Sequence, residues 1–298
     1  MVETTKKYNL NVSEKTRILN LFRAIFRNNI LEKSLVFLNL NSGWFVKKLI
    51  PPNYLYKKGS IREITRNGIN YSLDISQVVD HYLYFGYKDN LFNYVKEDIE
   101  NSLIIFDVGA NIGTTSLFFS KLNTKSKVFS FEPHPDTFVK LEKNVGLNNF
   151  SNLNIYQLGL GDTIDVVKIY EVNEKNRGMN RVMKEDKSAI YPFKKIKINK
   201  LDNFMSEKNV ERLDFIKIDV EGLEYSVLKG GEKTLRKNKP TILLELDDNN
   251  LLENDASAKI LIEFLIDLGY NKIYRADNYK IIEPNIDFKN CHFDIIAK

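Results

Sequence analysis

Short apolar runs separated by segments of helix-forming composition dominate the chain from residue 103 onward. The runs cover residues 103–108, 127–131, 153–158, 215–220 and 242–246. This alternation is typical of parallel strands joined by crossover helices that cover both faces of a sheet. We therefore predict an α/β fold with a Rossmann-like, doubly wound, mostly parallel sheet. Two later strand-like pieces, 272–275 and 292–297, would close that sheet as an antiparallel pair.

The first part of the chain follows a different pattern. After Ser13, apolar residues recur at helical spacing, and a second helical stretch follows. Two consecutive prolines at residues 51–52 then interrupt the pattern. We predict an N-terminal helical extension over residues 1–52 and one larger domain over residues 53–298.

Composition narrows the class of protein. Hydrophobic residues make up 43% of the 298 residues and charged residues 28%, which is ordinary for a globular chain. The formal net charge is +5, and its lysine pairs are scattered, so we expect solvated surface and no nucleic-acid partner. The apolar runs are far shorter than the about 20 residues of a membrane span, so no transmembrane segment is expected.

The compartment follows from two further features. The chain has one cysteine, Cys291, and a lone thiol suits a reducing compartment. The first residues also lack the apolar stretch of a secretion signal, because Lys6 and Lys7 are followed by polar residues. We therefore expect a cytoplasmic protein, and a homo-oligomer is compatible with this composition.

The first strand-to-helix turn carries the strongest chemical signal. An apolar strand ends at Asp107-Val108, and the turn then contains Gly109, Asn111 and Gly113. Glycines at these places let the backbone turn tightly and approach a ligand closely. The third glycine of the dinucleotide pattern is absent, and an acid at 107 would repel phosphates. The turn alone leaves both a nicotinamide dinucleotide and S-adenosylmethionine open.

Acidic residues follow the predicted strands at the edge where such sheets bind ligands. They are Asp107, Glu132, Asp162, Asp219 and Glu245. Glu132 lies at the distance from the glycines at which an acid accepts ribose hydroxyls. S-adenosylmethionine carries two cationic groups, a sulfonium and an ammonium, so an acidic edge suits it better than a pyrophosphate.

The strand at 215–220 is unusually polar for the centre of a parallel sheet. Because side chains alternate, Lys217, Asp219 and Glu221 should share one face. Buried ionisable groups are costly unless they are paired or line a polar cavity. Either a Lys217 ion pair with a neighbouring acid or a polar cavity would explain them.

At this point the sequence resembles a known family. The segments that carry the resemblance are 107–113, 131–135, 159–162, 201–202, 214–222 and 227–231, of which Lys217-Ile-Asp-Val-Glu-Gly222 is the most specific. They resemble the successive motifs of the FkbM-type methyltransferases over roughly residues 75–298. The resemblance implies a class I methyltransferase fold and an S-adenosylmethionine-dependent O-methyltransferase whose acceptor is a sugar, a glycan or a natural product.

The resemblance also implies roles for single residues. The methionine part of the cofactor would be cradled by Asp107, Gly109, Asn111 and Gly113. Glu132, next to Pro133, would hold the ribose, and Gly161-Asp162 the adenine end. Asp219 would lie beside the sulfonium methyl.

A hydroxyl acceptor also benefits from a general base near the point of transfer. We prefer Glu221 and Glu245 for this role, with Asp219 as a third candidate that the cofactor is expected to occupy. His134 has a suitable pKa but should lie on the adenosine side, at the surface or the adenine edge. The acids show no metal-loop spacing, so no metal is expected.

Two other enzyme classes stay open at the level of sequence. A nicotinamide-dependent oxidoreductase shares the glycine turn, and an RNA methyltransferase shares the scaffold. Dense Lys/Arg tracts and the Asn-Pro-Pro-aromatic signature of enzymes that methylate base nitrogens are both missing. An O-methyltransferase acting on a small-molecule or glycan hydroxyl is therefore the function that the sequence favours.

Overall fold

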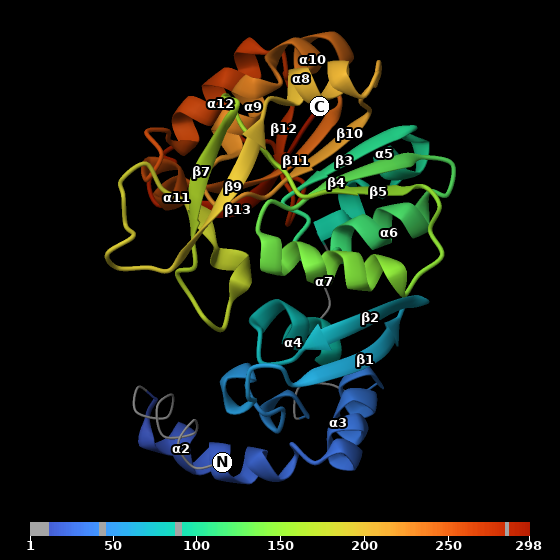
Figure 1. Cartoon of the computed structure of the whole chain (residues 1–298), viewed down its shortest axis with the longest axis vertical. Coiled ribbons are helices and arrows are strands. Elements are labelled where there is room, and N and C mark those ends of the chain that lie inside the picture. The colour runs from blue at the N-terminus through green and yellow to red at the C-terminus, as the bar shows by residue number, and fades with distance from the viewer. Residues whose placement is uncertain (1–11, 42–45, 87–90, 284–285) are drawn as a thin grey trace. The chain divides into compact units, whose positions relative to one another are not determined.

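A computed structural model describes residues 12–41, 46–86, 91–283 and 286–298 (Figure 1). The chain divides into two compact units. The N-terminal unit comprises Met1–Lys88 and Asn173–Gly178, and the sheet unit comprises Asp89–Val172 and Met179–Lys298. The boundary predicted after residue 52 falls inside the N-terminal unit, because residues beyond it bond to the helices before it. For example, Arg62 Nε lies 2.6 Å from Glu32 Oε1.

Helices and one hairpin build the N-terminal unit. Its elements are α2 (Glu14–Ile25), α3 (Asn29–Asn41), the 3-10 turns η1 (Val46–Lys48) and η2 (Asn53–Leu55), β1 (Ile61–Arg66), β2 (Ile69–Asp74) and α4 (Val78–Phe85). The Ser13 hydroxyl accepts a hydrogen bond from Thr16 N at 3.3 Å and so begins α2 where the sequence predicts a helix. The fully buried Glu32 carboxylate pairs with Arg62 and accepts a bond from the Tyr84 hydroxyl at 2.9 Å.

The sheet unit alternates strands and helices along the chain, as the apolar runs predict. Its strands are β3 (Ile104–Val108), β4 (Lys127–Phe131), β5 (Leu153–Tyr156), β6 (Gly159–Leu160), β7 (Asp165–Tyr170), β8 (Arg181–Val182), β9 (Phe193–Asn199), β10 (Phe215–Ile218), β11 (Thr241–Asp247), β12 (Ile273–Arg275) and β13 (His292–Ala297). Its helices are α5 (Lys96–Asn101), α6 (Thr114–Leu122), α7 (Pro135–Gly146), α8 (Leu201–Glu207), α9 (Glu224–Gly230), α10 (Glu232–Asn238), α11 (Asp248–Leu252) and α12 (Ala258–Asp267). Two 3-10 turns, η3 (Leu91–Tyr94) and η4 (Arg177–Met179), complete the described elements.

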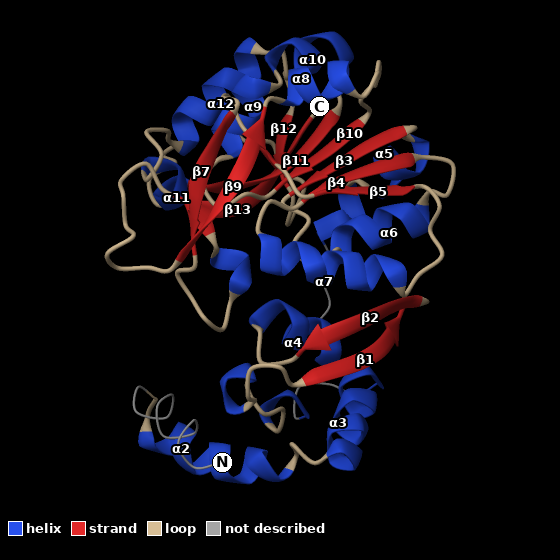
Figure 2. Ribbon diagram, viewed as in Figure 1, coloured by secondary structure: helices blue, strands red, loops and turns tan. Residues whose placement is uncertain are grey.

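Seven of these strands form the main sheet, in the order β12-β13-β11-β10-β3-β4-β5 (Figure 2). Neighbouring strands from β11 to β5 are parallel, whereas β13 is antiparallel to both β11 and β12. The predicted doubly wound sheet with a closing antiparallel pair is confirmed. In this register Lys217 on β10 lies opposite Asp107 on β3.

Apolar side chains cover both faces of the main sheet. Along β3, Ile105 packs into one buried cluster, and Phe106 packs into the cluster on the opposite face. One cluster includes Phe119 of α6, and the other includes Phe204 of α8. Because a strand buried on both faces must be apolar at successive positions, the continuous runs in the sequence correspond to these central strands.

A separate sheet of four strands corrects one expectation. Its order is β6-β9-β7-β8, and the run predicted at 153–158 ends as a strand of the main sheet at Tyr156. Asp162 therefore follows β6 of the small sheet rather than a strand of the main sheet. The polar stretch after β7 also contributes a strand here, since β8 pairs with β7 at Ile169–Val182. Within the described ranges, no helix is long and apolar enough to cross a bilayer.

Candidate active site

The turn between β3 and α6 has a backbone that only glycine accommodates at two positions. Gly109 has φ +83°, and a Cβ there would lie 1.8 Å from the carbonyl oxygen of Asp219. Gly113 has φ +90°, and its Cβ would lie 2.6 Å from Leu141 Cδ1. We call residues 109–113 the glycine bend. Because β10 packs directly against it, the bend brings the end of β3 next to Asp219.

Glu132 fastens the glycine bend to the end of β4. Its carboxylate accepts hydrogen bonds from Asn111 N and His134 N, both at 2.9 Å, and the residue is 7% exposed. Burial raises its pKa to about 7 in spite of these bonds. Each carboxylate oxygen keeps lone pairs beyond its backbone bond, so the group can still accept hydroxyl donors such as those of a ribose.

Asp107 and Lys217 form a buried ionic layer beneath the bend. Asp107 is fully buried, and its carboxylate accepts a bond from the Ser116 hydroxyl at 2.5 Å. Lys217 Nζ lies 2.9 Å from Asp219 and 3.8 Å from Asp107. Burial alone would lower the pKa of Lys217, but the charges of Asp219 and Asp107 outweigh it and raise that pKa. The structure contains the ion pair of Lys217 with a neighbouring acid, which is one of the two explanations that the sequence left open.

Three carboxylates lie close together, two of them just after the end of β10 and the third on β11. Asp219, Glu221 and Glu245 each place a carboxylate oxygen within 4.8 Å of the other two, and we call them the carboxylate cluster. Burial, followed by the charge of Asp219, raises the pKa of Glu221 to about 8 and that of Glu245 to about 9. The structure thus brings together the three predicted catalytic candidates. One detail differs, because Glu245 lies within β11 rather than beyond its end.

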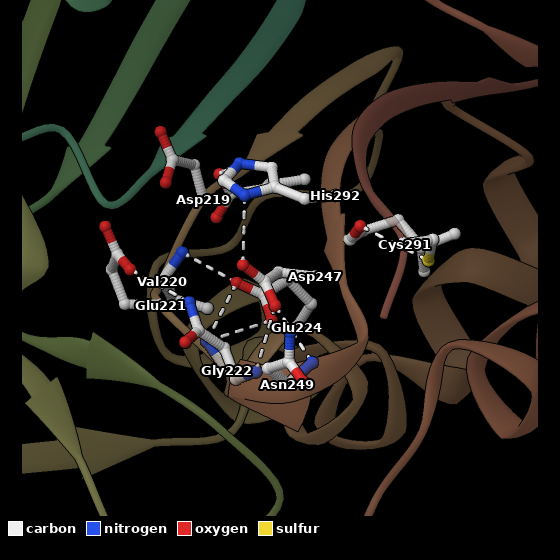
Figure 3. A network of polar contacts seen from close by, with 12 residues as sticks. Asp219, Val220, Glu221, Gly222, Glu224, Asp247, Asn249, Cys291 and His292 are labelled. Atoms are coloured by element: carbon white, nitrogen blue, oxygen red, sulfur yellow. Dashed lines mark hydrogen bonds and ion pairs between the residues drawn. The ribbon is translucent and has the colours of Figure 1, made fainter. Parts of the chain in front are cut away.

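A tight turn after β10 fixes the position of Glu221. Glu221 has φ +54°, and a Cβ on Gly222 would lie 2.5 Å from Asn250 O. The buried Glu224 carboxylate accepts bonds from Val220 N at 3.0 Å and from Gly222 N (Figure 3). Sequence reasoning missed Glu224. The signal is its position at the start of α9, where a carboxylate often accepts backbone N–H groups.

Side chains from α11 and the small sheet flank Glu221. Asn250 Nδ2 donates to Glu221 Oε2 at 3.1 Å, and Arg181 in turn donates to Asn250 Oδ1. The Nε of Arg181 also lies 3.4 Å from Glu253. Arg181 is not among the residues that the sequence predicts for the site. Its contact with Asn250 depends on β8 joining the small sheet, which no local pattern predicts.

His292 lies beside Glu245 of the carboxylate cluster. Its ring nitrogens are 3.1 Å from Glu245 Oε1 and 3.2 Å from Asp247 Oδ2, and its side chain is 66% exposed. Figure 3 shows the contact with Asp247. Asp247 also accepts bonds from Asn249 N and Asn250 N and so begins α11. The antiparallel pairing of β13 with β11 explains this proximity, because His292 is the register partner of Asp247.

The adenine-side candidates occupy the start of the small sheet. The Asp162 carboxylate accepts bonds from Ser226 Oγ at 2.7 Å and Lys229 Nζ at 3.1 Å. A Cβ on Gly161 would lie 3.0 Å from Ile198 Cγ2, so this glycine allows close packing of β6 on β9. Pro133 lies beside β6, since a Cβ on Gly159 would be 3.5 Å from its Cβ.

The histidine after Pro133 is not at the surface. His134 is 3% exposed, and its Nε2 lies 3.2 Å from Glu171 Oε1. Burial lowers its pKa against the opposing charge of Glu171. Sequence reasoning left a surface or an adenine-edge position open, and the burial rules out the first. Together with Asp136, His134 and Glu171 form a group whose ligand atoms are close enough to hold a metal ion. The carboxylate cluster is a second group of this kind.

The residues around the glycine bend fit S-adenosylmethionine. Within the described part of the chain, Asp107 Oδ1 and Asn111 Oδ1 are buried acceptors without a hydrogen-bond partner. Such acceptors suit the ammonium of the methionine part, and Glu132 suits the ribose. The main sheet with its antiparallel closing pair, the glycine bend and the acidic edge define the class of S-adenosylmethionine-dependent methyltransferases.

Comparisons with known proteins agree with this class. The family described as Methyltransferase FkbM domain matches residues 107–272. The 2-O-methyltransferase NoeI of Sinorhizobium fredii is 24% identical over 174 residues, which are 54% of this chain and 70% of NoeI. The hexuronic acid methyltransferase AglP of Haloferax volcanii is 29% identical over 194 residues, 65% of this chain and 76% of AglP.

A solved structure of an FkbM methyltransferase from Methylobacillus flagellatus aligns with a TM-score of 0.45 at 14% identity, over 92% of this chain and 60% of that one. The family match covers more than half of the 298 residues. The chain belongs to the FkbM methyltransferase family and is an S-adenosylmethionine-dependent enzyme. The alternative of a nicotinamide-dependent oxidoreductase is therefore wrong.

Proposed function

We propose that this enzyme transfers the methyl group of S-adenosylmethionine to a hydroxyl oxygen of a sugar, a glycan or a natural product. The observation that carries the proposal is the carboxylate cluster next to the glycine bend, which offers a base where the methyl group would be delivered. The names of two relatives, a 2-O-methyltransferase and a hexuronic acid methyltransferase, support a sugar hydroxyl as the acceptor.

The cofactor half of the site would bind through residues that are already in place. Asp107, Asn111 and the backbone of Gly109 and Gly113 would hold the methionine part, Glu132 the ribose, and Pro133, Gly161 and Asp162 the adenine end. When bound, S-adenosylmethionine would supply an electrophilic methyl group on a cationic sulfur, and the S–C bond would break to leave neutral S-adenosylhomocysteine. The enzyme then has to hold an acceptor oxygen about 3–3.5 Å from that carbon and exclude water.

Glu221 would act as the general base of the reaction. Its carboxylate would accept the hydroxyl proton as the new O–C bond forms, and Asn250 would keep that carboxylate oriented through its 3.1 Å bond. A pKa near 8 leaves Glu221 largely protonated at neutral pH in the free protein. A positive charge bound beside the cluster lowers that pKa. The base would therefore become available only when the cofactor half is filled.

A transfer assay with methyl-labelled S-adenosylmethionine tests the proposal. The enzyme is incubated with a panel of mono- and oligosaccharides, hexuronic acids and hydroxylated natural products, and with RNA as a separate arm. Label in an alkali-stable ether of one hydroxyl acceptor supports O-methylation. Label that enters only carboxylates as esters, only RNA, or no acceptor at all while S-adenosylhomocysteine binds contradicts it.

A further inference from the structure

Helix α2 presents its apolar side to the solvent. The side chains of Ile18, Leu21, Phe22 and Ile25 are 58%, 71%, 60% and 61% exposed. They recur at i, i+3, i+4 and i+7, so they form one continuous stripe along the 12-residue helix. We call these four residues the α2 stripe. Single exposed apolar residues are ordinary, but an apolar helix face left in water indicates a partner.

Polar bonds hold α2 in this orientation. On the inner side, Asn20 is 2% exposed, and its Nδ2 donates to the Tyr54 hydroxyl at 3.2 Å. Arg23 Nε donates to Lys48 O at 2.8 Å. A surface helix of a globular protein ordinarily turns its apolar face to the core and its polar face to water. The two faces of α2 are reversed, so rotation of the helix would break these bonds before it buried the stripe.

The exposed apolar surface continues at the start of α3. Ile30 is 75% exposed there, and it lines a shallow hollow together with Lys33 and Ser34. Basic residues border the stripe on α2 itself, where Lys15 and Arg17 are both exposed. Apolar side chains flanked by lysine and arginine are the pattern of a helix that lies in the interface of a membrane.

Charge is divided unequally between the two units. The sequence of the N-terminal unit contains 16 Lys and Arg against seven Asp and Glu, a formal charge of +9. The sheet unit contains 28 against 32, a charge of −4. The net +5 of the whole chain thus conceals a strongly basic unit. Two copies of such a unit repel each other, whereas an anionic surface attracts it.

We propose that the α2 stripe docks on an anionic lipid bilayer, with the helix lying in the interface. The stripe would enter the boundary between headgroups and acyl chains, and the basic side chains would face anionic headgroups. Since α2 has 12 residues and no described helix can span a bilayer, the contact is peripheral. This proposal rests on the N-terminal unit alone and is independent of the methyl acceptor.

Sedimentation with vesicles tests the proposal on the full-length protein. The vesicles contain either phosphatidylcholine alone or an equimolar mixture with phosphatidylglycerol. We expect the protein to sediment with the anionic vesicles and to be released by high salt. The double variant Leu21→Ser/Phe22→Ser should bind at least about tenfold more weakly. Ile190→Ser, an equally exposed apolar position in the sheet unit at 67%, is the matched control and should bind as the wild type does.

The remaining outcomes each overturn the proposal. Absence of binding to the anionic vesicles at low salt would do so, as would binding that the double variant keeps. Self-association in analytical ultracentrifugation that the double variant loses, without vesicle binding, would assign the stripe to a second copy instead. Far-UV circular dichroism and thermal unfolding of the same samples show that each variant is folded, and neither measurement depends on the result of the transfer assay.

Discussion

The active site has a cofactor half, which contains Asp107 and Glu132, and a transfer half, which is the carboxylate cluster. The two halves differ in the groups that their carboxylates contact. In the cofactor half, the Glu132 carboxylate accepts two backbone N–H groups, and Asp107 accepts a hydroxyl. In the transfer half, Asp219, Glu221 and Glu245 face one another within 4.8 Å. Burial, followed by the charge of Asp219, raises the pKa of Glu221 and of Glu245. One half is therefore preorganised by backbone hydrogen bonds, whereas the other brings three carboxylates close together.

This difference separates binding from chemistry. A group that already accepts hydrogen bonds in the free protein, as Glu132 does, holds its geometry at no further cost when a ligand arrives. Groups that repel one another lower stability, but their raised pKa values suit proton transfer near neutral pH. Changes in the cofactor half should therefore affect affinity, and changes in the transfer half should affect turnover and pH dependence.

The largest effect should come from filling the glycine bend. Gly109→Ala places a Cβ against the backbone of Asp219 at a φ of +83°, so we expect a loss of about 3–5 kcal/mol in unfolding free energy and no cofactor binding. Urea unfolding and titration with S-adenosylhomocysteine measure both. Gly146→Ala is the control, because nothing lies within 4 Å of its Cβ and the alanine should be tolerated. Equal stability of the two variants would contradict the strict requirement at 109.

The next effect should be on turnover alone. Glu221→Gln removes the base but keeps the size of the side chain, so we expect kcat to fall by about 10²–10⁴ and the Kd for S-adenosylhomocysteine to change by less than about twofold. Glu263→Gln, on the exposed side of α12, is the matched control. If Glu221→Gln turns over normally and Glu245→Gln does not, the base is Glu245, and the comparison between the halves still holds.

A smaller effect should appear on cofactor affinity. Glu132→Ala deletes the ribose acceptor and leaves Asn111 N and His134 N without their bonds. We expect the affinity for S-adenosylhomocysteine to fall by about 10- to 100-fold. At saturating cofactor, kcat should stay within about threefold of the wild type. Isothermal titration together with steady-state kinetics separates these quantities, and an unchanged Kd would remove Glu132 from the binding site.

The smallest effect concerns stability and pH. The pKa of Glu245 is raised from 4.5 to about 9, so the native state keeps a proton that the unfolded chain has released between these values. The unfolding free energy therefore falls as pH rises through this window. Glu245→Gln should be more stable than the wild type by about 1–2 kcal/mol at pH 8.5 and by almost nothing at pH 4. Thermal unfolding at both pH values measures this, and a variant that is less stable than the wild type at pH 8.5 would show that the Glu245 carboxylate stabilises the fold despite its acidic neighbours.

Much of this organisation could be predicted from local sequence. The runs around β3, β4, β10 and β11 are mostly apolar because both faces of these strands are buried, so their location is plain. The glycine bend and Glu132 can also be predicted, because both lie directly at the ends of predicted strands and their roles depend on the local backbone there. The clustering of Asp219, Glu221 and Glu245 follows from the adjacency of β10 and β11.

Other features depend on contacts between distant segments. Asp162 belongs to the small sheet because β6 pairs with β9, and two-residue strands leave almost no pattern in a sequence. Arg181 and His292 reach the transfer half only through the pairing of β8 and β13. The orientation of α2 is a different case. Helical spacing predicts the helix but does not say which face meets the protein, and here the polar bonds of Asn20 decide it.

The position of Arg181 in the small sheet determines how its contact with Asn250 could be changed by mutation. The residue is carried by a short strand of the small sheet, outside the doubly wound scaffold that builds the glycine bend. Segments of this kind tolerate exchange better than central strands. Exchange of β8 would thus change the side chain that contacts Asn250 while the glycine bend stays intact.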